Sequence, residues 1–385
     1  MARYSIYFVL ASVLILICIG IVMLSSTGAF AQDSHGDMYY FVKRQSIWVV
    51  VGLIACVVGS LIDYHWWQKT WYIWFGVSAL LLAACFMPPL GMRINGSWRW
   101  LNLGIMAFQP SELAKLASVF FLAWWFTRFE KKMFETKIKN FFYGLIFPGL
   151  CIAIILALIA LEVDMGSTAL IGAVMFGMMF VAGSSLFYLI PLVLIGIMGG
   201  VYAAIHIPER LERLLAFLHP EAYRLTEGLQ QWQALIAFGS GGLTGLGLGE
   251  GRQKMLYLPY AHTDFIFPMI GEELGLQITL MVVFAFLVLC IAGCQVAIKA
   301  QDRVGLLIGF GCIMLISLQA IVNIGMTTSC LPNKGMPLPF ISYGGSNIAI
   351  CLFMIGILIN IHRQIRHPIT ETRIPALEYR PVMRC

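Results

Sequence analysis

The chain has 385 residues, of which 60% are hydrophobic and only 11% are charged. Soluble globular proteins carry about 25% charged residues, so this composition excludes a soluble fold and predicts a polytopic membrane protein. The formal net charge of +6 comes from basic residues that are spread between apolar runs, which argues against a nucleic-acid-binding surface.

Apolar runs of about 20 residues, the length needed to cross a bilayer, recur along the whole chain. The first expected span runs from about Ser5 to Leu24 and leads to Ala29-Phe30-Ala31, which is similar to a signal-peptide cleavage site. Its apolar core exceeds the roughly 7–15 residues of a cleaved signal, so we interpret it as a retained span. The other expected spans cover residues 46–62, 71–87, 111–127, 141–161, 168–184, 186–205, 270–297, 304–327 and 343–362.

These spans predict an all-α integral membrane fold with ten transmembrane helices. One polytopic domain is expected over residues 1–367, followed by a cytoplasmic tail at residues 368–385. Residues 206–269 join the seventh and eighth helices and are expected to form a large extracytoplasmic loop. Gly183-Ser184-Ser185 is the only break between the sixth and seventh spans, so a re-entrant hairpin is the alternative there.

Basic residues divide unevenly between alternate connections when the N-terminus is placed in the cytoplasm. The inner connections and tail carry most of them, whereas the short outer loops carry few. The long loop at residues 206–269 has a length at which the positive-inside rule weakens. The rule therefore predicts that both termini are cytoplasmic. The inner basic residues are Arg3, Lys69, Arg128, Lys131, Lys132, Lys137, Lys139, Lys299, Arg303, Arg363, Arg366, Arg373, Arg380 and Arg384.

Two polar segments precede the fourth span. The segment from Arg93 to Leu101 combines interfacial tryptophans with an Asn-Gly turn signal, which predicts an outer hairpin that carries Arg99. In the next segment, Pro110 suits a first helical turn, and Glu112 and Lys115 lie three residues apart on one helix face. Two interpretations of this pair stay open: an ion pair that neutralises itself, or a buried site for an anionic head group.

Asp164 lies in a short outer loop, where a helix cap or turn residue is the favoured interpretation. Seven glycines between Gly239 and Gly251 are not closed by Gly-Lys-Ser/Thr, so they do not form a nucleotide-binding loop. Their backbone N–H groups could approach a pyrophosphate, but flexible or tightly packed backbone is the commoner explanation.

The stretch from Gly239 to Leu276 is the longest region that cannot lie in lipid. Ionisable groups at the edge of a membrane are expensive unless they serve a purpose, so this stretch is a candidate functional site. On spacing alone, Thr263 and Asp264 could instead cap the helix that begins near Phe265. The stretch interleaves its glycines with Arg252, Lys254, His262, Asp264, Glu272 and Glu273.

A rigid Pro/Gly turn from Lys334 to Ser346 enters the tenth span. It places one cation, Lys334, and two hydroxyls, Ser342 and Ser346, at the membrane edge. This arrangement again predicts an outward-facing polar site.

These segments together resemble the motifs of the shape, elongation, division and sporulation (SEDS) family, and they span most of the chain in that family's order. The Arg-Gln-Lys and Ala-His-Thr-Asp elements are more similar to the division members than to the elongation members. The segments are Asn95-Gly-Ser-Trp-Arg-Trp100, Gln109-Pro-Ser-Glu-Leu-Ala-Lys115, Gly249-Glu-Gly-Arg-Gln-Lys254, Ala261-His-Thr-Asp-Phe-Ile-Phe267, Gly271-Glu-Glu-Leu-Gly275 and Lys334-Gly-Met-Pro-Leu-Pro-Phe-Ile-Ser-Tyr-Gly-Gly-Ser346.

The resemblance implies a peptidoglycan glycosyltransferase in the bacterial cytoplasmic (inner) membrane, with an extracytoplasmic active face and lipid II as substrate. In that family the aspartate of His-Thr-Asp-Phe, here Asp264, is the essential acidic residue. The implied partners are a class B penicillin-binding protein, which cross-links the strands, and other membrane proteins of the divisome. A face with Gly172, Ala173 and Gly177 would permit close helix contact with such a partner.

Two positions depart from the family pattern. Glu162-Val163 stands where the family usually has Gln-Pro or Glu-Pro, which bears on the kink into the sixth span. Tyr260 stands where Leu-Pro is often followed by Glu. The second departure removes a carboxylate, so no metal or acid/base role can be carried over to that position.

The chemistry requires a base near a sugar 4-hydroxyl and cations near the departing lipid diphosphate. We expect Asp264 to be the base. A divalent cation such as Mg²⁺ or Mn²⁺ is compatible with this chemistry because hard cations bridge carboxylate and pyrophosphate oxygens, but the sequence identifies no metal ligands. The expected substrate-binding residues are Arg99, Glu112, Lys115, Arg252, Lys254, His262, Thr263, Lys334, Ser342 and Ser346, with Asp164, Glu272 and Glu273 in supporting roles.

Three alternatives remain at this point. A flippase for lipid II would use the embedded Glu112 and Lys115 to line a polar path. An elongation-type polymerase of the same family would carry out the same reaction for cell shape, and a scaffold would only recruit a partner. Polar groups gather on one side of the predicted membrane body, which favours an enzyme over a flippase.

Overall fold

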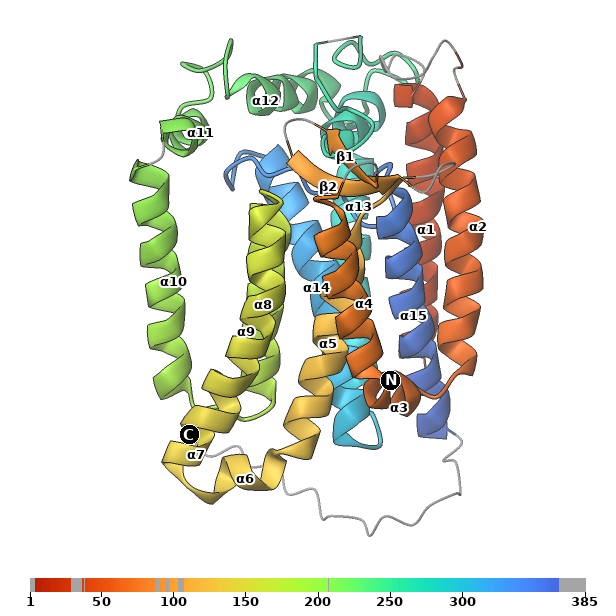
Figure 1. Cartoon of the computed structure of the whole chain (residues 1–385). Helices are drawn as coiled ribbons and strands as arrows, with labels where there is room; N and C mark the ends of the chain where they lie inside the picture. The colour runs from red at the N-terminus through yellow and green to blue at the C-terminus, as the bar shows by residue number, and fades with distance from the viewer. Residues whose placement is uncertain are drawn as a thin grey trace.

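The computed structural model describes residues 4–28, 37, 39–87, 90–94, 97–102, 107–206, 208–255 and 257–366. The Ala29-Phe30-Ala31 segment, the Asn95-Gly96 turn and the predicted tail at residues 368–385 lie outside the described residues. Helices occupy every expected span, and they pack side by side into one bundle (Figure 1).

The apolar runs form long helices because each run satisfies its own backbone hydrogen bonds in a medium without water. The stretches α1, α2, α7 to α8, α13, α14 and α15 are long and apolar enough to cross a membrane, and α4, α9 and α10 are shorter apolar helices. The matching helices are α1 (Ser5–Thr27), α2 (Tyr40–Leu61), α4 (Trp71–Ala84), α5 (Pro110–Arg128), α7 (Lys137–Phe141), η3 (Phe142–Ile146), α8 (Phe147–Leu161), α9 (Met165–Val181), α10 (Leu186–His206), α13 (Ile266–Ile298), α14 (Arg303–Thr327) and α15 (Gly345–Arg366). The chain is therefore a mostly helical, multi-pass membrane protein.

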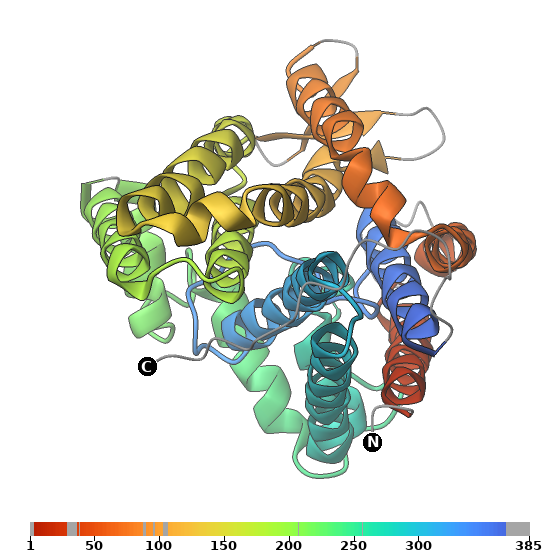
Figure 2. The ribbon, with the colours of Figure 1, turned by 90° about the horizontal axis from the view of Figure 1, so that it is seen from below.

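The centre of the bundle is formed by α5, α14 and α15. In α14 and in α15, 72% of the most apolar 18-residue stretch is buried inside the protein, compared with 22% in α2. Viewed from below, α1 and α2 lie on one side and α8 to α10 on the other, with α14 between them (Figure 2). The polar residues of α5, α14 and α15 therefore face protein and not lipid.

The two ends of the bundle differ in character. The lower end in Figure 1 carries α3 (Tyr64–Lys69), α6 (Glu130–Glu135) and α7, the start of α1 and the end of α15. We call it the basic end, because the described basic residues expected inside, such as Lys132 and Lys299, lie there. The opposite end carries a small sheet, α11 (Pro208–Leu218), α12 (Leu229–Gly241) and the loops before α13 and α15, and we call it the polar end.

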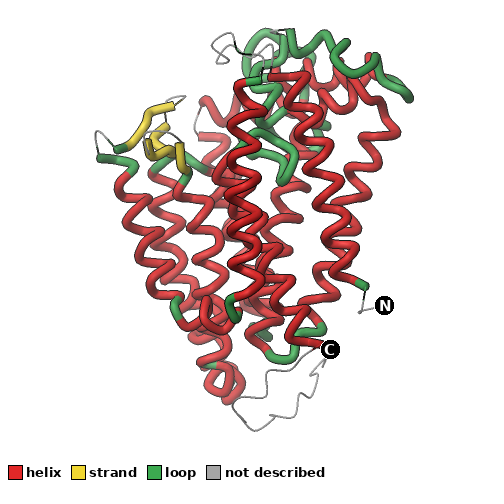
Figure 3. Tube along the Cα trace, turned by 90° about the vertical axis from the view of Figure 1, so that its right-hand side faces the viewer, coloured by secondary structure: helices red, strands yellow, loops and turns green. Residues whose placement is uncertain are grey.

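A small three-stranded antiparallel sheet at the polar end adds to the otherwise helical fold (Figure 3). The strands are β1 (Gly91–Ile94), β2 (Ser97–Asn102) and β3 (Ala107–Phe108), in the order β1-β2-β3. The expected hairpin is confirmed, with Arg93 opposite Trp98 and Ile94 opposite Ser97. Tryptophans favour extended backbone, and the hairpin presents Arg99 from β2.

The helix α13 is broken at Gly275, whose φ of 78° lies outside the helical region. Its 33 residues would span about 50 Å, which exceeds the roughly 30 Å hydrocarbon core, so one part projects into the polar end. The loop after α12 fills the break: Leu246 N–H donates to Glu272 O at 2.9 Å, and Leu276 N–H donates to Gly242 O at 3.0 Å. These bonds satisfy backbone groups that the break would otherwise leave unpaired.

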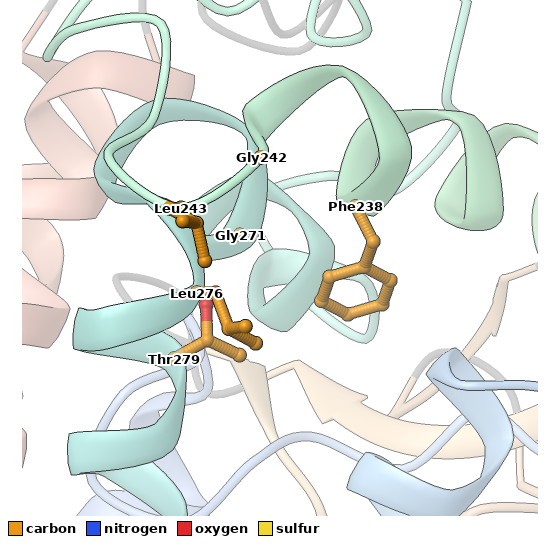
Figure 4. Close-up of a pocket in the computed structure, with 6 residues that line it drawn as sticks. All are labelled: Phe238, Gly242, Leu243, Gly271, Leu276 and Thr279. Atoms are coloured by element: carbon orange, nitrogen blue, oxygen red, sulfur yellow. The ribbon is translucent and has the colours of Figure 1, made fainter.

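Tight packing explains some of the glycines around this break. A Cβ at Gly241 would lie 1.9 Å from Gly271 O, and a Cβ at Gly275 would lie 2.4 Å from Gly245 N. Beside the break is a pocket of about 280 Å³, lined by Phe238, Gly242, Leu243, Gly271, Leu276 and Thr279 (Figure 4). Its lining holds no ionisable group, so the pocket is not the site of acid–base chemistry.

The prediction that α9 exposes a face of small residues is wrong at Gly177. A Cβ at Gly177 would lie 2.4 Å from the Met314 side chain of α14, so Gly177 packs inside the bundle. Gly172, by contrast, has open space where a Cβ would lie. The two glycines differ because α9 turns only one face to α14.

Candidate functional site

Asp264 lies in the loop that enters α13, at the polar end. The N-cap residue of α13 is Phe265, and among the described residues no side chain caps this helix, so the capping interpretation of Thr263 and Asp264 is wrong. Thr263 Oγ1 instead donates to Tyr260 O at 3.2 Å. The Asp264 carboxylate is therefore not used to terminate the helix.

The backbone around Asp264 is fixed by Asn323 of α14. Asn323 Nδ2 donates to Asp264 O at 2.9 Å and to Met336 O at 2.6 Å, which joins the loop before α13 to the loop before α15. A Cβ at Gly335 would lie 2.9 Å from Asp264 Oδ2, so the backbone of residue 335 passes directly over the carboxylate. Lys334, which is half-buried, precedes this contact.

The surroundings of the Asp264 carboxyl group bring its pKa close to neutral pH. Loss of hydration on burial raises the pKa of Asp264 to about 7, while the Arg99 guanidinium lowers it and the Asp164 carboxylate raises it. Asp264 retains some accessible surface, so a substrate hydroxyl can reach it. A carboxyl group with a pKa near the working pH is suited to general base catalysis.

Asp164 and Arg99 reach this site from α9 and β2. Asp164 Oδ1 accepts a hydrogen bond from Ser167 N–H at 3.1 Å, which confirms that Asp164 caps α9. Its Oδ2 accepts from Gln109 Nε2 at 3.3 Å. Arg99 donates to Val163 O at 2.6 Å. Segments from β2, α5, α9, α13 and the loop before α15 therefore converge near Asp264.

Ser342 and Ser346 hold backbone in place at this end. Ser342 Oγ accepts from Leu338 N–H at 2.7 Å, and Ser346 Oγ accepts from Gln109 N–H at 3.1 Å. His262 packs its ring against Phe41, with ring centroids 4.3 Å apart. These contacts give the three residues a structural role in shaping the loops that surround Asp264.

Glu112 and Lys115 form a buried ion pair deeper in the bundle. Lys115 Nζ lies 2.8 Å from Glu112 Oε1, and both side chains are 4% exposed. Lys115 also donates to Gln319 Oε1 at 3.0 Å, and Asn347 Nδ2 donates to Glu112 Oε2 at 3.1 Å. Of the two interpretations, the geometry favours the pair that neutralises itself and holds α5, α14 and α15 together.

Lys254, Glu272 and Glu273 anchor the glycine-containing loop. Lys254 Nζ lies 2.7 Å from Glu273 Oε1, and these side chains are 1% and 0% exposed. Ser26 of α1 donates to Glu273 at 2.7 Å, and Glu272 Oε1 accepts from Arg252 N–H at 2.9 Å. Lys254 is therefore turned inward, whereas the Arg252 side chain is exposed on the same loop.

Sequence reasoning missed several residues that shape the site. Gln319 and Asn323 lie four apart in the apolar α14, and buried polar residues inside membrane helices were the available signal for them. Gly335 and Gln109 were quoted only as parts of motifs. Their contacts depend on the tertiary fold, so no local pattern identified them.

Comparisons with known proteins agree with this architecture. The model of the FtsW, RodA and SpoVE family, described as "Cell cycle protein", matches residues 6–367. A probable peptidoglycan glycosyltransferase FtsW of Geobacter metallireducens is 38% identical over 365 residues, covering 94% of this chain and 96% of that protein. Stage V sporulation protein E of Bacillus subtilis is 36% identical over 363 residues, covering 92% and 96%.

Solved structures share the fold. A chain of a peptidoglycan synthase complex that coordinates polymerization and crosslinking superposes with a TM-score of 0.76 at 23% identity, covering 94% of this chain and 98% of that chain. The crystal structure of the rod shape determining protein RodA of Thermus thermophilus superposes with a TM-score of 0.67 at 24% identity, covering 92% and 96%.

Proposed function

The chain belongs to the FtsW, RodA and SpoVE family of cell cycle proteins, and we propose that it polymerises lipid II at its polar end with Asp264 as the general base. The protein is a peptidoglycan glycosyltransferase of cell division. The observation that carries the site assignment is a carboxyl group whose pKa is raised to about 7, beside the Arg99 guanidinium and beneath the residue 335 backbone.

The proposed reaction follows from these groups. The ionised Asp264 takes the proton of an acceptor sugar 4-hydroxyl, whose oxygen forms a bond to the anomeric carbon of the donor. The bond between that carbon and the phosphate oxygen breaks, and its electron pair leaves with the lipid diphosphate. Arg99 has five N–H donors, and within the described part of the chain two of them are used by backbone carbonyls, so the remainder can bind diphosphate oxygens. The exposed Arg252 supplies a second cation.

A divalent cation is a further part of the proposal. Within the described ranges, no group of three or more His, Cys, Asp and Glu residues is placed to hold a metal. Asp164 is close enough to raise the pKa of Asp264, and Mg²⁺ is commonly bound by one or two carboxylates together with substrate phosphates. These two residues would hold the ion, which would stabilise negative charge on the diphosphate.

The proposed topology has ten membrane helices, cytoplasmic termini and the polar end outside. The gathering of basic residues at one end supports it. The test uses a background in which Cys330 and Cys385 are replaced by serine. An impermeant thiol reagent should label Glu221→Cys in intact cells and Lys132→Cys only after permeabilisation. The reverse pattern would place the proposed site on the wrong face.

A class B penicillin-binding protein is the proposed partner. The support is the shared fold with a chain of a synthase complex in which polymerization and crosslinking are coordinated. Co-expression and purification in mild detergent should give one complex of the two membrane proteins. Separate species under conditions that keep both folded would remove this support.

The proposed activity is tested with purified protein and lipid II, with the products resolved by size. Glycan strands should form when the protein, with its partner, is the only transferase present. A flippase would give a different result, because it would move lipid II between the leaflets of a vesicle and would form no polymer. Absence of polymer from the wild type, even with the partner added, would contradict the proposed reaction.

A further inference from the structure

The backbone of residues 335–337 crosses Asp264 without belonging to a helix or a sheet. A Cβ at Gly335 would lie 2.9 Å from Asp264 Oδ2, yet among the described residues no backbone–backbone hydrogen bond involves Gly335, Met336 or Pro337. Pro337 also lacks an N–H group to donate. The position of this segment over the carboxylate is therefore set by side chains.

Two amide side chains of α14 supply these contacts. Asn323 Nδ2 donates to Met336 O, and Gln319 Nε2 donates to the next carbonyl, Pro337 O, at 2.9 Å. The two amides lie four residues apart and therefore on one face of α14. Asn323 also donates to Asp264 O, whereas Gln319 holds only the segment above the carboxylate. Loss of the Gln319 contact would therefore move the segment relative to Asp264.

The buried ion pair deeper in the bundle determines which way the Gln319 amide points. Gln319 is 3% exposed, and its Oε1 accepts from Lys115 Nζ at 3.0 Å. An ammonium group can only donate, so the amide oxygen must face Lys115 and the NH2 group must face Pro337 O. Glu112 neutralises Lys115 and completes the chain. A buried ion pair is often no more stabilising than apolar residues of the same size, so stability alone does not account for this one.

We propose that Gln319 is a positioning residue for Asp264, and that the Lys115–Glu112 pair serves it by orienting the Gln319 amide. Gln319 and Asn323 together hold residues 335–337 at a fixed place over the carboxylate, which keeps the carboxylate in one position. Gln319 acts through this backbone and not by contact with the substrate. This role rests on the proposed glycosyl transfer, since it requires Asp264 to be the base.

The test compares Gln319→Met with Gln364→Met. Methionine is about as long as glutamine but has no N–H group to donate. Gln364 of α15 is the matched control, because it is also buried and its Nε2 donates to two groups at the basic end, Asp63 Oδ1 at 3.1 Å and Asn360 Oδ1 at 3.0 Å. Both variants should unfold at a lower temperature than the wild type, since each loses two hydrogen bonds.

Polymerisation of lipid II separates the two variants. Gln319→Met should lose about 10- to 100-fold in kcat, because a displacement of the base lowers the rate of the chemical step. Its Kd for lipid II should match that of the wild type, because the proposed diphosphate-binding residues Arg99 and Arg252 lie on other segments. Gln364→Met should keep the wild-type kcat.

A double variant shows whether Gln319 acts through residues 335–337. Gly335→Ala also displaces this segment or the carboxylate beneath it. If both changes act on the same contact, the loss of kcat in the double variant should be close to that of the slower single variant and well below the product of the two losses. Losses that multiply would mean that Gln319 acts elsewhere, and would reject the proposed role.

A folded Gln319→Met with the wild-type kcat, or equal losses of kcat in the two methionine variants, would overturn the positioning role and leave the proposed function in place. If Gln319→Met does not fold, Gln319→Asn replaces it, because its amide is one methylene too short to contact both Lys115 and Pro337. Failure of both Gln319 variants to fold, beside a folded Gln364→Met, would show that Gln319 only holds the bundle together. If the wild type forms no polymer, the proposed function fails and the positioning role falls with it.

Discussion

At the basic end His65 lies between two aspartates, whereas at the polar end Asp264 and Glu162 lie in surroundings that favour their neutral forms. His65 Nδ1 is 2.7 Å from Asp63 Oδ1, and His65 Nε2 is 2.8 Å from Asp302 Oδ2. Although burial opposes the change, hydrogen bonds from His65 and Tyr64 lower the pKa of Asp302. The same carboxyl chemistry is thus stabilised as an anion at one end and as an acid at the other.

This difference separates structural from chemical use of carboxyl groups. The aspartates of the basic end join the α2–α3 corner to the start of α14, and their charges are matched by His65. The charge of Asp264 is not matched in this way, because the effect of burial, which raises its pKa, outweighs the opposing effect of the Arg99 guanidinium. Strongly perturbed acids at an accessible position are typical of functional sites. Substitution of an acid whose charge is matched by a cation should therefore lower stability, whereas substitution of Asp264 should lower activity.

The largest effect on stability is expected at Glu273, a polar-end acid that, unlike Asp264, is paired with a buried cation. Glu273→Gln leaves the Lys254 ammonium buried without its counter-charge, which should destabilise the fold by about 3–5 kcal/mol. Chemical unfolding measured in detergent checks this value. Glu250→Gln, an exposed acid of the same loop, should change stability by less than about 0.5 kcal/mol. Equal effects of the two substitutions would contradict the anchoring role.

Gly335→Ala is expected to reduce activity with little change in stability. The new Cβ would lie 2.9 Å from Asp264 Oδ2, so the carboxylate or the loop must shift. A small misplacement of a catalytic group lowers the rate, here by about 10- to 100-fold. Gly149→Ala in α8 is the control, since its Cβ meets open space. Polymerisation rates at saturating lipid II distinguish them, and a fully active Gly335→Ala would show that Asp264 tolerates displacement.

Much of this organisation was predictable from the sequence. Apolar runs predicted the long helices of the bundle, because length and hydrophobicity are the main signals for membrane insertion, but not the short helices α3, α6, α11 and α12. The Asn-Gly turn signal beside the tryptophans of β2 predicted the β1–β2 hairpin, although not that a third strand would extend it. Asp164 was expected to be a cap and is one. These features depend on residues close together in the chain.

The parts that could not be predicted depend on contacts between distant segments. The charges of Arg252 and Lys254 are equivalent in sequence, yet one side chain is exposed and the other is buried against Glu273. The break at Gly275 is invisible in the apolar pattern, because it is stabilised by a loop about 30 residues earlier. Glu162 was noted only as a departure from a motif. Its burial arises from the fold around the α8–α9 turn.

A smaller effect is expected at the basic end. Asp302→Asn keeps the N-cap of α14 but removes the charge that holds His65, so the fold should lose about 1 kcal/mol. The value is modest because 34% of the Asp302 side chain is exposed to water. Thermal unfolding near pH 6 checks it. No loss of stability in this variant would mean that the basic-end cluster is only a solvated surface pair.

The smallest effect is expected at Val163, whose φ of 66° is left-handed. Glycine removes the strain of the left-handed conformation, roughly 1–2 kcal/mol, but adds about 0.5–1 kcal/mol of chain entropy to the unfolded state. Val163→Gly should therefore stabilise the fold by up to about 1 kcal/mol. Val50→Gly is the matched control, because Val50 is equally exposed at 57% but lies in a helix, where glycine destabilises. Effects of the same sign would remove the evidence for strain.

The most direct test measures activity and stability side by side in Asp264→Asn and Asp302→Asn. We predict that Asp264→Asn folds, reaches the membrane, binds lipid II and loses at least about 10²-fold in polymerisation, because asparagine cannot accept the proton. Its unfolding temperature should not fall, since an uncharged group suits that position. Asp302→Asn should be less stable but active. Robust polymerisation by a folded Asp264→Asn would contradict the assignment of the base.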